Sequence, residues 1–274
     1  MGKVLPHLSI PTFHLSPPRF SPFTPSLFTS MPNPLIVALD VPDADAALRL
    51  AAAVGPHVGA VKIGSELFTA AGPDIVRRMR AAGATVFLDL KFHDIPNTVA
   101  RAVAAATRLD VQMLTIHTSG GPAMMRAAEQ AAVETAGALG RPAPLVLGVT
   151  VLTSMDAAQL AAVTLESDVA RQVERLARLA ADAGLRGLVC SPLELGVLRR
   201  VLPSTMQLVT PGIRTGPVAP GDDQKRTLGP AEAMAAGANW LVVGRPIYAA
   251  PDPVAAARNL LLLLPGSGTG ARRE

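Results

Sequence analysis

From residue 35 onward, short apolar runs alternate along the chain with longer stretches in which apolar residues recur at helical spacing. The short runs have the length of buried strands, and the longer stretches have the period of amphipathic helices. In the stretch 169–180, for example, the apolar residues fall on one stripe of a helix. We expect eight strands, at residues 35–39, 60–63, 85–88, 113–116, 145–149, 187–189, 207–209 and 240–243.

This alternation predicts an α/β protein with a single folded domain. Strands separated by helices pair in parallel through right-handed crossovers. Eight such units within about 240 residues match the count and size of a closed (β/α)₈ TIM barrel. A doubly wound open sheet is the alternative, but no G-x-G-x-x-G motif follows the first expected strand. We place the barrel at residues 34–265 and a flexible C-terminal tail at 266–274.

The first thirty residues differ in composition from the rest of the chain. They contain no Asp or Glu, only Lys3 and Arg19 as charged residues, and repeated prolines that break any helix. We predict a disordered Pro- and Ser-rich extension over residues 1–33, or sequence translated ahead of a true start at Met31. A transit peptide is the alternative, but the arginine-rich amphipathic helix that it would need is missing.

Composition and charge exclude several classes of protein. Hydrophobic residues make up 49% of the chain and charged residues 17%, which indicates a substantial buried core rather than global disorder. The net charge of +4 includes no block of Lys and Arg, so a nucleic-acid partner is not expected. One cysteine excludes an internal disulfide framework, and the longest aliphatic run, 260–264, is too short for a membrane span. We therefore expect a soluble, cytoplasmic protein without a membrane partner.

Polar residues gather at the C-terminal ends of the expected strands, where a (β/α)₈ barrel has its active site. Taken singly, Asp40 could be a turn residue, and Lys62 could extend its ammonium group to solvent. Their shared placement instead favours a joint site at one end of the barrel. The residues in such positions are Asp40, Lys62, Asp89, Lys91, His117, Thr153, Ser154, Arg214 and Arg245.

The strongest cluster is the segment DLKFHDIPNT, which begins at Asp89. Asp89 and Lys91 are two residues apart, so an extended backbone would point both side chains to the same side. Asp94 lies in the loop beyond, where Pro96 restrains the chain. With Lys62, the site could hold an alternating array of cations and anions, in which the carboxylates keep Lys91 protonated. A surface salt bridge is the alternative, but it leaves unexplained why charges follow directly on an apolar strand.

Two further segments predict a phosphate site: TPGIR, which ends at Arg214, and GRPIY, which begins at Gly244. Glycines let backbone N–H groups approach a phosphate closely, and arginine adds paired donors. The ends of the seventh and eighth strands are a frequent phosphate-binding position in these barrels. Ordinary turn glycines beside solvated arginines are the alternative.

Over residues 35–258, the sequence resembles the orotidine 5′-phosphate decarboxylase family. The segments that carry the resemblance are LIVALD ending at Asp40, VKIG around Lys62, DLKFHDIPNT from Asp89, VTVLTS through Ser154, TPGIR ending at Arg214, GDDQKR around Gln224 and GRPIY from Gly244. The resemblance implies decarboxylation of orotidine 5′-monophosphate to UMP, the last step of pyrimidine nucleotide synthesis, with neither a cofactor nor a metal ion.

The resemblance also implies a role for each site residue. Lys91 would protonate ring carbon six, the vinyl carbanion, after carbon dioxide leaves, and Asp89 would lie beside the substrate carboxylate. Asp40 and Lys62 would hold ribose hydroxyls and complete the charge array. Asp94 and Thr98 would reach into the neighbouring active site of a homodimer whose sites are shared across the interface. Pyrimidine contacts would come from Thr153 and Ser154, and the phosphate grip with its closing loop from Arg214, Gln224, Gly244 and Arg245.

Two other functions compete with this interpretation. A magnesium-dependent sugar-phosphate decarboxylase or aldolase of the same superfamily would need an acidic metal ligand at position 62, where a lysine would repel magnesium. A non-catalytic barrel that binds a phosphate ligand gives no reason for Lys91 within the array. Cys190, after the sixth expected strand, is predicted to pack in the core.

Overall fold

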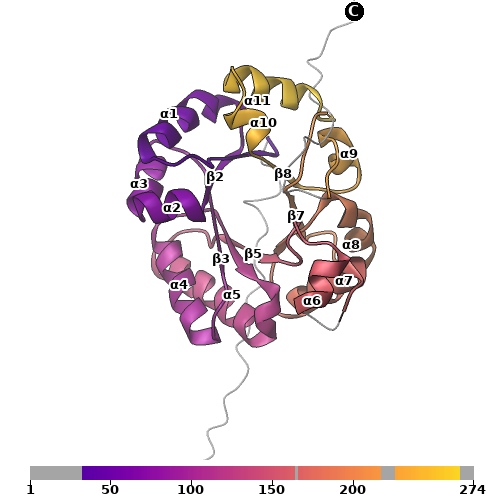
Figure 1. The fold of residues 1–274 in the computed structure, drawn as a ribbon. Helices are drawn as coiled ribbons and strands as arrows, with labels where there is room; N and C mark the ends of the chain where they lie inside the picture. The colour runs from indigo at the N-terminus through magenta and orange to yellow at the C-terminus, as the bar shows by residue number, and fades with distance from the viewer. Residues whose placement is uncertain (1–32, 164–165, 217–225, 266–274) are drawn as a thin grey trace, which may run out of the picture. The chain divides into compact units, whose positions relative to one another are not determined.

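The computed structural model describes residues 33–163, 166–216 and 226–265. Within them, eight parallel strands close into a barrel in the order β1 to β8, with β8 paired to β1. Helices surround the strands as a ring (Figure 1). The predicted (β/α)₈ fold is therefore confirmed. Gln224, the C-terminal tail and the N-terminal extension before residue 33 lie outside the described residues.

The bounds of the elements follow the apolar pattern of the sequence. The strands are β1 (Leu35–Ala38), β2 (Ala60–Gly64), β3 (Val86–Phe92), β4 (Met113–His117), β5 (Leu145–Val149), β6 (Gly187–Val189), β7 (Gln207–Thr210) and β8 (Trp240–Val243). The helices are α1 (Ala44–Val54), α2 (Ser65–Ala71), α3 (Asp74–Ala81), α4 (Pro96–Arg108), α5 (Gly121–Ala138), α6 (Ala157–Val163), α7 (Val169–Asp182), α8 (Leu195–Val201), α9 (Pro230–Ala235), α10 (Arg245–Tyr248) and α11 (Pro253–Leu262). Short 3₁₀ turns are η1 (Gly55–His57), η2 (Thr118–Gly120) and η3 (Pro192–Glu194).

The third strand differs from its prediction, because β3 continues four residues past the expected end at Leu88. Its pairing with β4 shifts register between Leu88 and Phe92, which marks a bulge. Within this bulge Lys91 has φ +52°, in the left-handed region. The assumption of an extended backbone at Lys91 is therefore wrong, and Asp89 and Lys91 lie inside the strand rather than after it.

Side chains on the strands alternate between two buried layers. On β1, Leu35 and Val37 pack in the apolar layer between strands and helices, to which Val54 of α1 also belongs. Ile36 and Ala38 are equally buried but point to the opposite face, into the barrel. Because both faces are covered, the strand sequence is apolar throughout, which explains why the strands were predictable.

The helices contribute the other half of the outer apolar layer. Val173, Leu176 and Ala180 of α7 are buried, which confirms the stripe predicted over 169–180. Cys190 is buried too, and burial raises the pKa of its thiol to about 12, as suits a core residue. None of the helices in the described parts of the chain is both long and apolar enough to cross a membrane.

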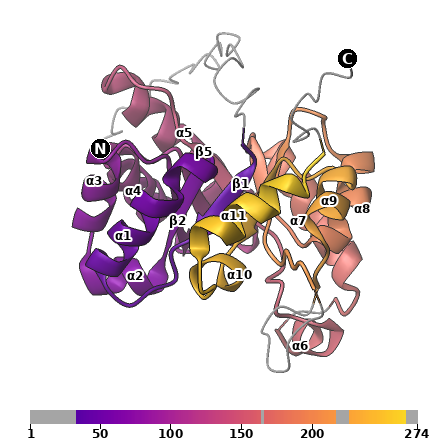
Figure 2. The ribbon, with the colours of Figure 1, turned by 90° about the horizontal axis from the view of Figure 1, so that it is seen from above.

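The end of the barrel that carries the functional residues can be recognised in Figure 2. Helices α2, α6 and α10 follow the C-terminal ends of β2, β5 and β8, and all three lie along the lower side of that view. The C-terminal ends of the strands therefore open toward this side. We call this opening the mouth of the barrel.

Candidate active site

A cavity of about 380 Å³ lies inside the mouth, and most of the predicted site residues line it. Its size suits a small-molecule ligand. The predicted residues that it brings together are Asp40, Lys62, Asp89, Lys91, Thr153, Ser154, Arg214, Gly244 and Arg245. These residues come from the C-terminal ends of six different strands. Side chains that are up to about 200 positions apart in the sequence therefore meet in one cavity.

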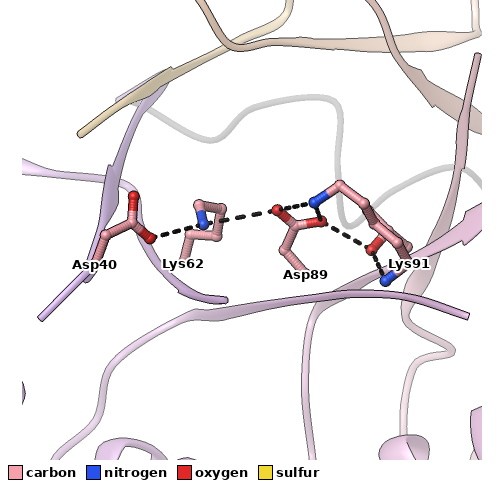
Figure 3. A network of polar contacts seen from close by, with 5 residues as sticks. Asp40, Lys62, Asp89 and Lys91 are labelled. Carbon is pink, nitrogen blue, oxygen red and sulfur yellow. Dashed lines mark hydrogen bonds and ion pairs between the residues drawn. The ribbon is translucent and has the colours of Figure 1, made fainter. Parts of the chain in front are cut away.

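Four of these residues form a row of alternating charge, which we call the charged array: Asp40, Lys62, Asp89 and Lys91. Lys62 Nζ lies 3.1 Å from Asp40 Oδ1 and 3.6 Å from Asp89 Oδ2. Lys91 Nζ donates to both carboxylate oxygens of Asp89 at 2.9 Å. Figure 3 shows the four side chains side by side in this order. The predicted array of two cations and two anions is present.

The centre of the array is better shielded from water than its ends. The side chains of Lys62 and Asp89 are 11% and 13% exposed, against 43% for Asp40 and 35% for Lys91. Burial by itself would raise the pKa of Asp89, but the two lysines and the hydrogen bonds from Lys91 and Thr115 outweigh it, so that pKa is lowered. Asp89 is therefore a fixed carboxylate at neutral pH.

Thr115 of β4, which was not predicted from the sequence as a site residue, contacts two members of the array. Its hydroxyl oxygen accepts from the backbone N–H of Lys91 at 2.9 Å and donates to Asp89 Oδ1 at 2.9 Å. The side chain is fully buried. The sequence did contain a feature that could have indicated Thr115 as a site residue. It is a polar residue in the apolar run MLTIH, two residues before His117 and hence on the same face of the strand.

Gly64, at the end of β2, leaves room for the array. A Cβ atom at this position would lie 3.0 Å from Lys62 Nζ and 3.4 Å from Asp40 Oδ1. Any side chain at residue 64 would therefore press on the ammonium group of Lys62. This lack of space explains why the segment VKIG ends in a glycine.

Four further residues line the cavity, and we call them the arginine–glycine rim: Gly212, Arg214, Gly244 and Arg245. Gly212 has φ +80°, a conformation that favours glycine, and Arg214 N donates to Leu228 O at 3.0 Å. Arg245 begins α10 directly after Gly244. The rim thus places two guanidinium groups and the backbone of two glycines at one edge of the cavity, a donor set that suits an anion.

Tyr248 also lines the cavity, although it had not been predicted as a site residue. Burial raises the pKa of its phenol, and the nearby carboxylate of Asp40 raises it further, so the group is neutral at physiological pH. A hydroxyl is thereby available as donor or acceptor between the array and the rim. Its signal in the sequence was its spacing of three residues from Arg245 in GRPIY, which places both on neighbouring turns of one helix.

Arg226 ties two loops of the mouth together and was likewise not predicted. Its Nη2 atom donates to the backbone oxygens of Val151 at 3.3 Å and Leu152 at 2.9 Å, directly before Thr153. Its Nη1 atom forms an ion pair with Glu194, whose side chain is buried. This arginine therefore holds the loop after β5, which carries the predicted pyrimidine contacts. Its signal was its place at the end of the segment GDDQKR.

A pair of histidines lies next to the array. The ring centroids of His93 and His117 are 5.3 Å apart and the rings are tilted by 47°. Burial lowers the pKa of His117, and the nearby His93 and Lys91 lower it further, while Asp89 acts in the opposite sense. His117 is therefore neutral at pH 7 and adds no charge to the array.

Asp94 and Thr98 are the described site residues that the single chain does not bring to the cavity. Both are exposed, Asp94 between β3 and α4 and Thr98 in the first turn of α4, and neither is among the described residues that line the cavity. Asp94 Oδ1 accepts from the backbone N–H of Ile95 at 2.6 Å. The side chain of Ile95 is 66% exposed. The structure therefore does not test the predicted role of this segment in a neighbouring subunit.

Metal coordination finds little support in this arrangement. In the parts of the chain that the structure describes, no group of three or more His, Cys, Asp and Glu residues is placed to hold a metal ion. At the point where a metal ligand would be needed, Lys62 contributes an ammonium group between two carboxylates.

Comparison with known proteins gives a consistent result. The model of the "Orotidine 5'-phosphate decarboxylase / HUMPS family" matches residues 33–260. A protein of Opitutus terrae named orotidine 5′-phosphate decarboxylase is 54% identical over 227 residues, which are 83% of this chain and 96% of the relative. The protein of that name from Moorella thermoacetica is 52% identical over 225 residues, 82% of this chain and 89% of the relative.

A solved structure agrees with these relatives. The crystal structure of orotidine 5′-phosphate decarboxylase from Lactobacillus acidophilus superposes with a TM-score of 0.74 and 35% sequence identity, over 85% of this chain and 99% of that chain. The family match extends from two residues before β1 to the last turns of α11, and so includes every element that supplies the cavity. This chain belongs to the orotidine 5′-phosphate decarboxylase / HUMPS family.

Proposed function

We propose that this enzyme decarboxylates orotidine 5′-monophosphate to UMP with Lys91 as the proton donor, without a cofactor, at sites shared between the two subunits of a cytoplasmic homodimer. Family membership and relatives named for this activity at 52–54% identity support the reaction. The observation that carries the residue roles is the charged array, with the Lys91 ammonium held 2.9 Å from both oxygens of a buried carboxylate.

The reaction needs a positive charge at a defined place. When the bond between ring carbon six and the carboxylate breaks, carbon dioxide leaves and the electron pair of that bond stays on carbon six. This carbanion is poorly stabilised by delocalisation. Many decarboxylases place such electrons in a cofactor. Here the ammonium of Lys91 supplies electrostatic stabilisation that is preorganised by its contact with Asp89. A proton then passes from Lys91 Nζ to carbon six, and the neutral amine regains its proton from solvent.

Asp89 contributes to the same step from the other side. Because its pKa is lowered, it is charged when the substrate binds, and a substrate carboxylate beside it meets a like charge. This repulsion is relieved as neutral carbon dioxide leaves, so it raises the energy of the bound substrate more than that of the transition state. Asp89 also holds Lys91 in place, which makes it both an electrostatic and a positioning group.

The remaining residues bind the parts of the nucleotide that do not react. In this proposal Lys62 and Asp40 bind ribose hydroxyls, and Thr153 and Ser154 contact the pyrimidine; all four line the cavity. The arginine–glycine rim suits the phosphate. Binding energy from the phosphate end can be used to orient the reacting end, since both belong to one ligand. Gln224 keeps its proposed role in the phosphate grip, outside the described residues.

A homodimer accounts for the segment that carries Asp94 and Thr98. In one chain these side chains are exposed, and Ile95 beside them presents an apolar side chain to solvent. In the proposed dimer the segment is covered by a second copy, and Asp94 and Thr98 complete the partner's cavity. A symmetric pair of subunits provides two such sites.

The magnesium-dependent alternative is disfavoured by Lys62. The family description joins two names, so the family match alone does not separate the two chemistries. A cation between Asp40 and Asp89 occupies the electrostatic position that a divalent ion would need. Conversion of orotidine 5′-monophosphate to UMP by purified enzyme in excess chelator is the expected result, and loss of that activity on chelation would support the alternative.

The shared site is tested with mixed subunits. Lys91→Ala and Asp94→Ala enzymes are each expected to be inactive, but in a hybrid dimer one site contains both native residues. Free exchange at equal amounts should restore about one quarter of wild-type activity, since half of the dimers are hybrids with one intact site of two.

The matched control for this experiment mixes Lys91→Ala with Lys62→Ala. These residues come from the same chain, so no hybrid site is intact and no activity should return. Tagged subunits establish that exchange has occurred. No recovery in the first mixture despite exchange would reject the shared site, and would leave decarboxylation by this family member unaffected.

A further inference from the structure

One buried side chain outside the roles given above contacts both Lys91 and Asp89. Thr115 is the third residue of β4 and is 0% exposed. Its hydroxyl makes two hydrogen bonds of 2.9 Å, one to the backbone of Lys91 and one to the carboxylate of Asp89. No other role for this hydroxyl is needed by the fold, because valine has the same shape and suits a buried strand better.

The first hydrogen bond supports an unfavourable backbone. Lys91 has φ +52°, a conformation that is unfavourable for residues other than glycine. At this point the pairing of β3 with β4 shifts register between Leu88 and Phe92. Thr115 Oγ1 accepts the N–H of Lys91 within the shifted segment, so a side chain of β4 takes part in holding the bulge that aims Lys91.

The second hydrogen bond orients the carboxylate. Because Oγ1 accepts from the Lys91 backbone, its own hydrogen is free to point at Asp89 Oδ1. Asp89 Oδ1 therefore receives hydrogen bonds from both Thr115 and Lys91 Nζ, while Oδ2 faces Lys91 Nζ at 2.9 Å and Lys62 Nζ at 3.6 Å. These three groups, the Thr115 hydroxyl and the two lysine ammonium groups, together fix the orientation of the Asp89 carboxylate.

We propose that Thr115 is a positioning residue for the decarboxylation, which fixes the bulge at Lys91 and the carboxylate of Asp89 through one hydroxyl. It acts through these two residues rather than on the substrate. The inference rests on the proposed roles of Lys91 and Asp89. A displacement of about 1 Å at a reacting group can cost on the order of 100-fold in rate, which sets the scale of the expected effect.

The test compares Thr115→Val, which removes the hydroxyl at constant shape, with Thr115→Ser, which keeps it. We expect kcat of the valine variant to fall about 10- to 100-fold, with KM changed less than about threefold, because the lost contact acts on the reacting groups and not on the phosphate or ribose. The serine variant should keep most of the wild-type kcat.

The pH profile separates positioning from a merely structural role. The Thr115 hydroxyl is one of the groups that lower the pKa of Asp89. The other charged or titratable groups in its surroundings are Lys62 on β2, Lys91 on β3, His117 at the end of β4 and His93 beyond β3. Without the hydroxyl, the acidic limb of kcat/KM should move to higher pH in the valine variant, but not in the serine variant.

Thr107→Val is the matched control. Thr107 is also a buried threonine, and its hydroxyl donates to Val103 O within α4 at 2.8 Å, without any contact to the array. This variant should keep the wild-type kcat and pH profile even if its thermal stability falls. It therefore measures what the loss of any buried hydroxyl does to the enzyme.

The outcomes are decisive in either direction. Wild-type kcat and pH profile in Thr115→Val, or equal impairment of the valine and serine variants, would overturn the proposal. If the valine variant does not fold, Thr115→Ala replaces it with the same expected and opposing results. Failure of the proposed function is seen separately, as normal turnover by a Lys91→Ala enzyme, which contains an intact Thr115.

Discussion

The charged array and the arginine–glycine rim hold their side chains in different ways. The charged array is built on strands, where Lys62 and Asp89 are nearly buried and bonded to their neighbours in a row. The arginine–glycine rim lies beyond the ends of β7 and β8, on a turn that needs a positive φ at Gly212 and on the first residue of the short helix α10. Three of the four residues of the array thus lie within strands, whereas the rim lies on the segments that follow β7 and β8.

This difference matches the two tasks that we propose for the array and the rim. Stabilising a developing carbanion requires charges that are already in place, since reorganisation during the reaction would cost rate. Gripping a phosphate supplies binding energy, which can be used even if the binding segment adjusts. Changes in the array should therefore lower kcat, and changes in the rim should raise KM.

The largest effect is expected at Lys91. Lys91→Ala removes both the cation and the proposed proton donor, so kcat should fall by about 10³-fold or more while binding of UMP and the circular dichroism spectrum are preserved. Turnover within tenfold of wild type would contradict the role of Lys91.

A second substitution at the same position separates the two contributions. Lys91→Arg keeps a cation in the array, but a guanidinium does not release its proton at physiological pH. We expect this variant to be nearly as inactive as the alanine variant, as followed by the absorbance change of the pyrimidine. Substantial activity of the Lys91→Arg enzyme would show that residue 91 acts only through its positive charge and not as the proton donor.

A smaller effect of the opposite kind is expected in the rim. Arg245→Ala should raise KM about 10- to 100-fold, the scale of charge-assisted hydrogen bonds to phosphate, and change kcat much less. Orotidine, which lacks the phosphate, should be decarboxylated equally slowly by the variant and the wild type. A difference between the two enzymes on orotidine would place Arg245 outside the phosphate site. Arg258→Ala, an exposed arginine of α11, is the control and should leave both constants unchanged.

The smallest expected effect is a dependence of stability on pH beside the array. The pKa of His117 is lowered in the folded protein, chiefly by burial, so below about pH 6.5 the unfolded chain binds the proton more readily. The free energy of unfolding should therefore fall as the pH drops through this range. In urea denaturation at about pH 7.5 and pH 5.5, His117→Gln should lose less stability on acidification than the wild type. An equal loss of stability in both proteins would show that His117 does not cause this pH dependence.

Much of this comparison could be predicted from the sequence, for a physical reason. Strands buried on both faces are apolar throughout, so a charged residue at the end of such a run is conspicuous, as with Asp40 and Lys62. The glycine and arginine pairs after β7 and β8 were recognisable in the same way. Nine of the predicted residues meet in the cavity because parallel strands all end at the same side.

The residues that were missed depend on register and on contacts between distant segments. Thr115 joins the array only because β3 bulges at Lys91, and a bulge has no marker in an otherwise regular strand pattern. Arg226 reaches the backbone of residues 151 and 152, about 75 positions away. A sequence pattern shows which residues can do chemistry, but such cross-strand and cross-loop distances follow from closure of the barrel.

The absent side chain at Gly64 has a practical meaning for redesign of this barrel. A methyl group there would lie only 3.0 Å from the nitrogen of Lys62. Bulk added at the end of β2 to reshape the pocket for larger nucleotides is therefore expected to displace Lys62, so the connecting segments after β7 and β8 are the safer place to change selectivity.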